Sequence, residues 1–153
     1  MKEINYKVSF DKPFTHYCEV EISLNKIEED SVIFSMPVWT TGSYMVREYA
    51  KNVDRVTAEG SGGKSLSIEK INKNSWKVFN PGKKSISFSY RVYCNELTVR
   101  TSGINSEHAF ISPAGVFMTV RGMESVKCIL NIELPGDWKK ISTGLNRISG
   151  NVF

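Results

Sequence analysis

Residues 85–94, SISFSYRVYC, alternate between the two faces of an extended chain along their whole length. Ile86, Phe88, Tyr90, Val92 and Cys94 share one face, and the intervening side chains are serines, an arginine and a tyrosine. A period of two with one apolar face is typical of a β-strand that is buried on one side only. The stretch therefore predicts a strand in an antiparallel sheet with one wet face.

The same alternation recurs along most of the chain. It is clear at residues 4–10, 16–24, 32–36, 75–79 and 126–134, and weaker at residues 53–59, 66–71, 97–100 and 138–145. Turn residues separate these runs, as in Gly60-Ser61-Gly62-Gly63 and Asn80-Pro81-Gly82. We therefore expect an all-β fold, an antiparallel sandwich or saddle-like pair of open sheets, with at most one or two short helical turns. Those turns are expected within residues 43–51.

Composition excludes several classes of protein. The chain has 153 residues, 24% of them charged, and a net charge of +4 with scattered lysines, so a nucleic-acid surface is not expected. No apolar run approaches the roughly 18 residues that a membrane helix needs. The N-terminus has no signal-peptide core, which leaves two compartments open: the cytoplasm, or the periplasm or exterior after removal of a leader.

Metal-binding and catalytic motifs are missing from the sequence. The cysteines Cys18, Cys94 and Cys128 form no C-x-x-C pair, and each falls on the apolar face of an expected strand, which predicts small buried side chains. His16 and His108 are 92 positions apart, and neither begins H-E-x-x-H. His16 is expected to be a satisfied core or edge histidine. We expect no catalytic residue and no metal ligand in this chain.

Residues 39–53, WTTGSYMVREYAKNV, interrupt the regular strands. They resemble the W-x-P-G-x-Y-x-[IVM]-R-[DE]-[FY]-A-x-N-[IV] segment of the glycyl aminopeptidase family of zinc metallopeptidases. Similar pieces follow in the family's order over nearly the whole chain, at residues 11–22, 34–44, 73–78, 89–101, 109–118 and 134–145. Thr41 stands where the family usually has proline, and Ser112 where it usually has Asn or Asp.

The resemblance implies that the chain is one part of a larger enzyme. In the family, an N-terminal β domain precedes a thermolysin-like catalytic domain, which holds the H-E-x-x-H helix and the zinc ion. Residues 1–153 would then be a single non-catalytic β domain of a multidomain metallopeptidase. Its partners would be its own catalytic domain and, through the parent enzyme, a peptide with a free N-terminus and a small first side chain. Zinc would be the cofactor of the parent enzyme only.

The resemblance also directs attention to two loops, residues 39–47 and 105–117, as walls of the substrate cleft. Tyr44 would offer its hydroxyl as a hydrogen-bond group, Glu107 would pair with an ammonium, and His108 would line the cleft. Contacts with the next domain are expected from Trp39, Arg47 and Glu48, with Gly42 as the pivot of a turn. Both loops also suit a structural interpretation, as a buried turn and an ordinary long loop.

Two other interpretations stay open at this stage. The chain could be a free-standing β-sandwich module that binds carbohydrate or protein through exposed Tyr17, Tyr93 and Trp76. It could also be a purely structural interaction domain. A downstream H-E-x-x-H motif would favour the peptidase interpretation, and a stop codon after Phe153 would favour the binding module.

Overall fold

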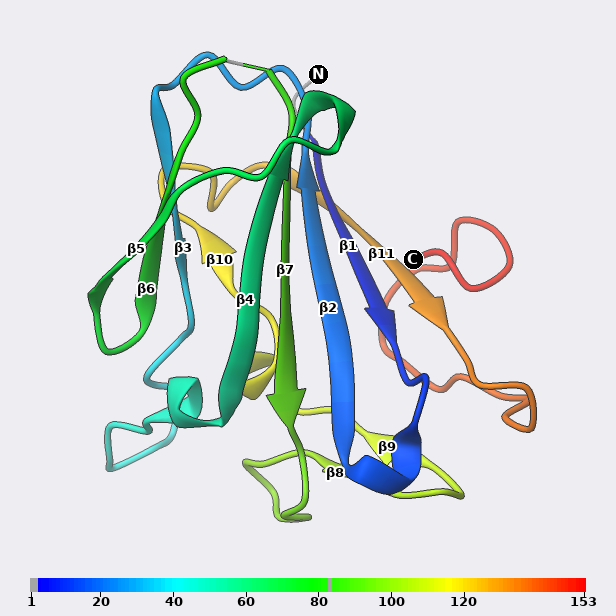
Figure 1. Cartoon of the computed structure of the whole chain (residues 1–153). Coiled ribbons are helices and arrows are strands. Elements are labelled where there is room, and N and C mark those ends of the chain that lie inside the picture. Colours follow the sequence, from blue (N-terminus) through cyan, green and yellow to red (C-terminus); the bar gives the residue numbers. More distant parts are fainter. Residues whose placement is uncertain (1–2, 83) are drawn as a thin grey trace.

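The computed structural model describes residues 3–82 and 84–153, and in it two sheets face each other (Figure 1). The larger sheet has five strands in the order β11 (Lys127–Glu133), β1 (Glu3–Ser9), β2 (Tyr17–Leu24), β7 (Ile86–Tyr93) and β4 (Val53–Gly60). The smaller sheet has the order β10 (Thr119–Val120), β3 (Ser31–Ser35), β6 (Ser75–Phe79) and β5 (Ile68–Asn72). A two-stranded ribbon joins β8 (Gly103–Ile104) to β9 (Ala109–Phe110). The all-β prediction is confirmed.

Among the described residues, helical geometry is limited to four short 3-10 turns: η1 (Pro13–Thr15), η2 (Tyr49–Asn52), η3 (Ser61–Gly63) and η4 (Pro113–Gly115). Only η2 overlaps the segment where the sequence predicts a helical turn. Within the described ranges, no helix is long and apolar enough to span a membrane.

The strand pairs are antiparallel with one exception. In the pair that holds the sheet's centre, β2 and β7 run antiparallel from Tyr17 opposite Tyr93 to Leu24 opposite Ile86. The exception is β11, which lies parallel to β1 with Ile4 opposite Cys128. A parallel pair needs a long crossover connection, and here the whole smaller sheet lies between the two strands in the sequence.

The apolar faces meet between the two sheets. Phe34 of β3 and Phe88 of β7 stack with ring centroids 4.0 Å apart and an interplanar angle of 4°. The alternation places their neighbours on the same faces, and these side chains are almost fully buried: Val20, Ile22, Leu24, Val78, Ile86, Tyr90 and Val92. Each such apolar side chain contributes roughly 1.5–3 kcal/mol on burial, so this layer holds the sandwich together.

Two expected strands do not form. Residues 97–100 make an exposed turn in which the Thr98 and Thr101 hydroxyls are hydrogen-bonded 2.7 Å apart. Residues 138–145 are irregular, because the Trp138 ring packs beside Phe10, with centroids 5.3 Å apart, instead of extending a sheet. In both places, local residue preference is overridden by tertiary contacts or by side-chain hydrogen bonds.

The cysteine prediction is right for two of the three residues. Cys18 and Cys94 are buried, but Cys128 is exposed. Cys128 lies near the start of β11, the edge strand of the larger sheet, whose side chains are at most partly buried. Alternation identifies the face of a strand but not whether another layer lies over it.

Candidate functional site

The two loops singled out from the sequence emerge at the same end of the sandwich. In Figure 1 this is the lower end, where η2, the loop before it and the β8–β9 ribbon all lie. Residues 39–47 and residues 105–108 occupy opposite corners of this end. The two loops can therefore belong to one interface, but their side chains cannot contact the same small chemical group.

The loop at residues 39–47 is a turn held by its own hydrogen bonds. The Ser43 amide donates to the Thr40 carbonyl at 3.0 Å, and Gly42 has φ +84°, which closes a β-turn. Only glycine adopts that φ without strain, so the expected pivot is present. The Trp39 indole donates to the Ser43 carbonyl at 2.8 Å, and the Arg47 amide donates to the Val38 carbonyl at 2.6 Å.

This turn presents apolar side chains to solvent. Tyr44 is fully exposed, Trp39 is 52% exposed, and Met45 and Val46 are 62% and 68% exposed. We call these four residues the apolar tip. Trp39 therefore does not belong to the core. Among the described residues, the Tyr44 hydroxyl has no hydrogen-bond partner.

The side chains of Arg47 and Glu48, at the end of the apolar tip, have different environments. The Glu48 carboxylate accepts from the Lys73 ammonium at 2.8 Å, and this hydrogen bond lowers the pKa of Glu48. Arg47 is half-buried, and its Nε atom is buried without a hydrogen-bond partner in the described part of the chain. Glu48 is thus engaged with the β5–β6 turn of its own domain, while Arg47 keeps an unused donor.

The loop at residues 105–108 is also a fixed turn. The Asn105 side-chain oxygen accepts from the Glu107 and His108 amides at 2.8 and 2.9 Å, and the Trp138 indole donates to the Ser106 carbonyl at 3.1 Å. The Glu107 and His108 side chains are exposed at its surface. They are available to a partner, and they do not converge with Tyr44.

The continuation of that loop is anchored inside the core. The buried Tyr90 hydroxyl donates to the Val116 carbonyl at 2.8 Å and accepts from the Met118 amide at 3.0 Å. Tyr90 lies on β7, so this contact joins the loop end to an interior strand of the larger sheet.

The structure also shows the environments of His16 and of the aromatic residues considered for a binding surface. The His16 Nδ1 lies 2.5 Å from the Ile104 carbonyl, so the ring is satisfied and ties the start of β2 to β8. Trp76 is only 5% exposed, and the Lys70 ammonium covers its ring. The expected exposure of Trp76 is therefore wrong, whereas Tyr93 is 40% exposed. Among residues 3–82 and 84–153, no three His, Cys, Asp or Glu side chains are grouped to hold a metal ion.

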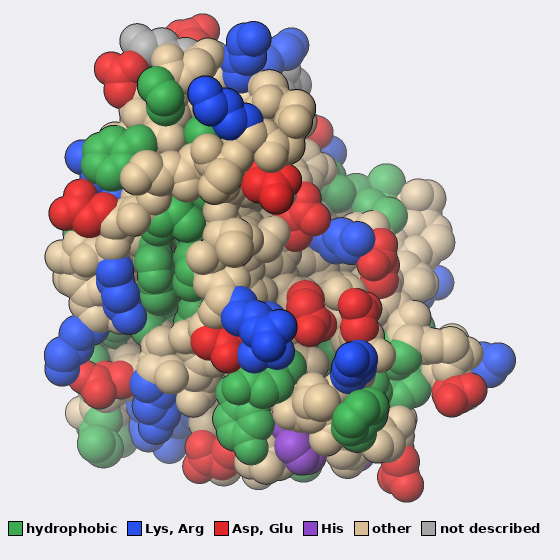
Figure 2. Space-filling view, viewed as in Figure 1, with side chains coloured by type: hydrophobic (Ala, Val, Ile, Leu, Met, Phe, Trp, Pro, Cys, Tyr) green, Lys and Arg blue, Asp and Glu red, His purple; other side chains and the backbone are tan. Residues whose placement is uncertain are grey.

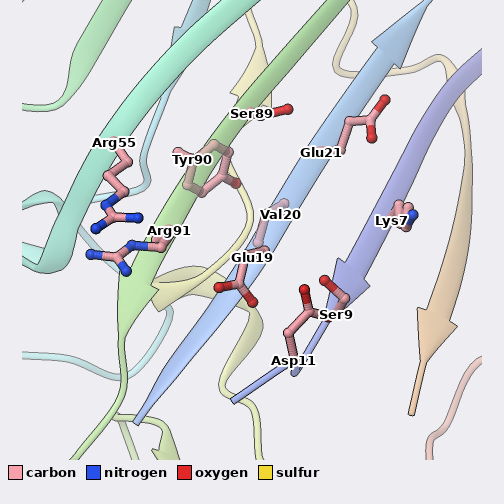
Figure 3. A pocket seen from close by; sticks show the side chains of 10 residues that line it. All are labelled: Lys7, Ser9, Asp11, Glu19, Val20, Glu21, Arg55, Ser89, Tyr90 and Arg91. Carbon is pink, nitrogen blue, oxygen red and sulfur yellow. The ribbon is translucent and has the colours of Figure 1, made fainter. Parts of the chain in front are cut away.

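Sequence reasoning missed a hollow on the outer face of the larger sheet. Its volume is about 380 Å³, and its lining includes charged residues of both signs from β1, β2, β7 and β4 (Figure 3). Alternation does place Glu19, Glu21 and Arg91 on this wet face. The hollow also depends on the register between distant strands, which a local pattern does not contain.

Comparison with known proteins places the chain in context. Residues 5–153 match the family model of the peptidase M61 N-terminal domain. An aminopeptidase N family protein from Idiomarina loihiensis has a similar structure, with 26% identity and a TM-score of 0.81, over 87% of this chain and 22% of that one. The chain thus spans about a fifth of that protein.

A more distant similarity is to an M1 zinc metallopeptidase from Deinococcus radiodurans bound to a Tyr-Ser-Ala substrate. It has 7% identity and a TM-score of 0.45 over 99% of this chain and 37% of that one, too remote to carry an argument. No curated protein matches the sequence.

Proposed function

The chain belongs to the peptidase M61 N-terminal domain family, and from this premise we propose that it is the non-catalytic β domain of a glycyl-aminopeptidase-like zinc metallopeptidase. In that role it packs on the catalytic domain of the same protein and forms one wall of the substrate cleft. The residues described here do not suit zinc: His16 is engaged with a carbonyl, and no ligand cluster surrounds it. We propose that the zinc ion of the parent enzyme is held by its catalytic domain.

The observation that carries this proposal is the apolar tip. Four large side chains are held outward by a turn whose hydrogen bonds fix their positions. Clustered exposed apolar side chains on a soluble domain mark interaction sites. Burying any one of them in an interface would contribute about 1.5–3 kcal/mol.

Other exposed apolar side chains extend this surface across the same end of the sandwich. They lie on η1, on the turn after β7 and on β9, namely Phe14, Leu97, Val99 and Phe110. The end as a whole therefore suits a neighbouring domain, with the apolar tip at one corner and the turn at residues 105–108 at the other.

The two corners would have different tasks in the cleft. Glu107 carries a carboxylate that could pair with the α-ammonium of a peptide, with His108 beside it. Tyr44 offers an apolar ring and an unused hydroxyl. Because the two corners are apart, Tyr44 and Glu107 would contact different parts of a bound substrate or of the catalytic domain.

The first test concerns the interface. The gene is read beyond the codon for Phe153, and the downstream H-E-x-x-H segment is produced separately and mixed with this chain in an analytical ultracentrifuge. Val46→Asp should weaken the association at least tenfold, because it places a charge in a desolvated contact. Ile148→Asp, at a similarly exposed position outside this end, should leave it unchanged. A stop codon after Phe153, or equal effects of both variants, would refute the proposal.

The second test concerns the cleft. In the intact enzyme, Tyr44→Phe should raise KM for glycyl and alanyl anilides with little change in kcat, because only a binding hydroxyl is lost. Unchanged kinetics would remove the Tyr44 hydroxyl from the cleft while leaving the docking role of the apolar tip intact.

A further inference from the structure

We propose that the hollow on the outer face of the larger sheet binds a short peptide with free ends, its ammonium between Glu19 and Asp11 and its carboxylate at Arg55. The site lies on the outer face of the strands and borders the loop end discussed above, since Asp11 precedes η1 and Arg55 follows η2, but the proposal does not depend on the function proposed for that end. Figure 2 shows charged side chains of both signs gathered over this face, and Figure 3 shows those that line the hollow.

Glu19 lies on β2 in the middle of the sheet, and its Oε2 atom has no hydrogen-bond partner in the described ranges, although the backbone amides of Glu19 and Asp11 and the charge of Arg91 act to lower the pKa of the carboxyl. Arg91 stands opposite Glu19 in the β2–β7 register, but its guanidinium donates to Asp54 on the far side, at 2.9 and 2.7 Å. The same guanidinium lies 4.1 Å from the centre of the Tyr17 ring, so it is held on two sides. Arg91, the cation opposite Glu19, is thus bound to Asp54 and Tyr17 instead of Glu19.

The next cation along the face is also committed. Lys7 pairs with Glu133 on the edge strand at 3.0 Å, and the neighbouring Glu21 accepts hydrogen bonds from two serine hydroxyls, Ser23 and Ser87. Oε2 of Glu19 is consequently a buried oxygen with no hydrogen-bond partner in the described ranges. Burial and the nearby Asp11 carboxylate raise the pKa of Glu19. A buried carboxylate oxygen without a donor is unfavourable, and an ammonium group would satisfy it.

Arg55 supplies the opposite charge on the far side of the hollow. The β4–β7 register shifts between Asp54 and Thr57, and Arg55 within this bulge has φ +49°, a left-handed conformation that costs energy for a residue with a side chain. Bulges redirect side chains, and here Arg55 lines one edge of the hollow, with its guanidinium on the same side as that of Arg91 (Figure 3). Arg55 helps to lower the pKa of Asp54, but Asp54 is already bonded to Arg91, so the Arg55 donors remain free among the described residues.

The spacing of the charges identifies the length of the ligand. Glu19 on β2 and Arg55 on β4 are separated by β7, and two strand spacings amount to about 10 Å. An extended peptide covers about 3.5 Å per residue, so a di- or tripeptide would bring its two termini to the two walls. A single amino acid would reach only one of them. The volume of about 380 Å³ suits a ligand of this size.

The test titrates the isotope-labelled 153-residue chain with triglycine and follows amide shifts by NMR. We expect saturable shifts in β2, β7 and β4 with a Kd of about 1 mM, since the site is open to solvent. N-acetyl-triglycine, which lacks the ammonium, and triglycine amide, which lacks the carboxylate, should each bind at least tenfold more weakly. Free glycine should also bind more weakly than triglycine.

Variants then assign the two ends. Glu19→Gln should remove the difference between triglycine and its acetylated form, and Arg55→Gly should remove the difference between triglycine and its amide. Glycine is chosen at position 55 because it tolerates the left-handed backbone. Glu69→Gln, an exposed carboxylate on β5 of the other sheet, is the control and should change nothing.

Three outcomes would overturn the proposal. One is the absence of shifts at about 20 mM triglycine, where a ligand with this affinity would nearly saturate the site. Another is equal binding of triglycine and its amide, which would show a site for a cationic group alone, such as a basic side chain of another protein. The third is an unchanged affinity in both variants.

Discussion

Removing the hydroxyl of Tyr90 tests how the loop at residues 105–117 is held to the sandwich. The Tyr90 ring is buried, and its hydroxyl serves both the Val116 carbonyl and the Met118 amide. Tyr90→Phe keeps the ring and leaves these two backbone groups without a partner. An unsatisfied buried polar group costs about 1–3 kcal/mol, so we expect unfolding to be easier by roughly 2–4 kcal/mol.

Urea unfolding followed by tryptophan fluorescence measures this change. With a slope of about 2 kcal/mol/M, the midpoint should fall by about 1–2 M. Tyr6→Phe is the matched control: its hydroxyl makes one hydrogen bond, to the Met118 carbonyl at 2.9 Å, and is only partly buried, so a loss of about 1 kcal/mol is expected. A loss in Tyr90→Phe no larger than in Tyr6→Phe would refute the reasoning, because it would mean that the loop end is not anchored by this hydroxyl.

Three further changes test the turn and the hollow. Gly42→Ala should cost about 1–2 kcal/mol from backbone strain alone, because an added Cβ meets no atom within 4 Å at φ +84°; unchanged thermal stability would contradict the turn geometry. Thr41→Pro should stabilise the chain by about 0.4–1 kcal/mol by restricting the unfolded state, measured by calorimetry, and destabilisation would show that the Thr41 conformation differs from that of proline. Glu19→Gln should make the chain more stable above the pKa of Glu19. A raised pKa means that the folded state binds the proton more tightly, so the wild-type free energy of unfolding falls as pH rises through the unfolded and then the folded pKa of Glu19. The wild-type and variant stabilities should therefore converge at acid pH, and a difference between them that does not depend on pH would contradict this.

The sequence predicted the fold where side-chain alternation coincides with real layers. The run at residues 85–94 became β7, with Phe88 and Tyr90 facing the smaller sheet as expected. The prediction was wrong at residues 138–145, where Trp138 packs beside Phe10, a contact that no local pattern contains. It was also wrong for Cys128, whose strand has the right pattern but lies at the edge of the sheet.

The sequence predicted the local turn of the candidate site but not the features that depend on distant strands. The Gly42 turn follows from local chemistry, since a positive φ at the third residue of a turn favours glycine, and the structure has that φ. The exposure of Trp39 does not follow from its residue type, because a tryptophan is usually largely buried. The hollow at Glu19 depends on the ion pair between Arg91 and Asp54, which leaves Glu19 without this cation as a hydrogen-bond partner. The two paired residues lie on strands that are far apart in the sequence, so no local pattern contains this contact. The roles assigned to Tyr44, Glu107, His108 and Arg47 stay predictions.

The parallel pairing of β11 with β1 bears on how the chain folds during synthesis. Ile4 emerges from the ribosome first, yet its partner Cys128 follows about 120 positions later, and contacts of such long sequence separation form slowly. Until β11 arrives, β1 presents an unpaired edge to other nascent chains. This domain should therefore be prone to aggregate when translation stalls before residue 127, and a truncation series should show solubility rising sharply once residues 127–133 are included.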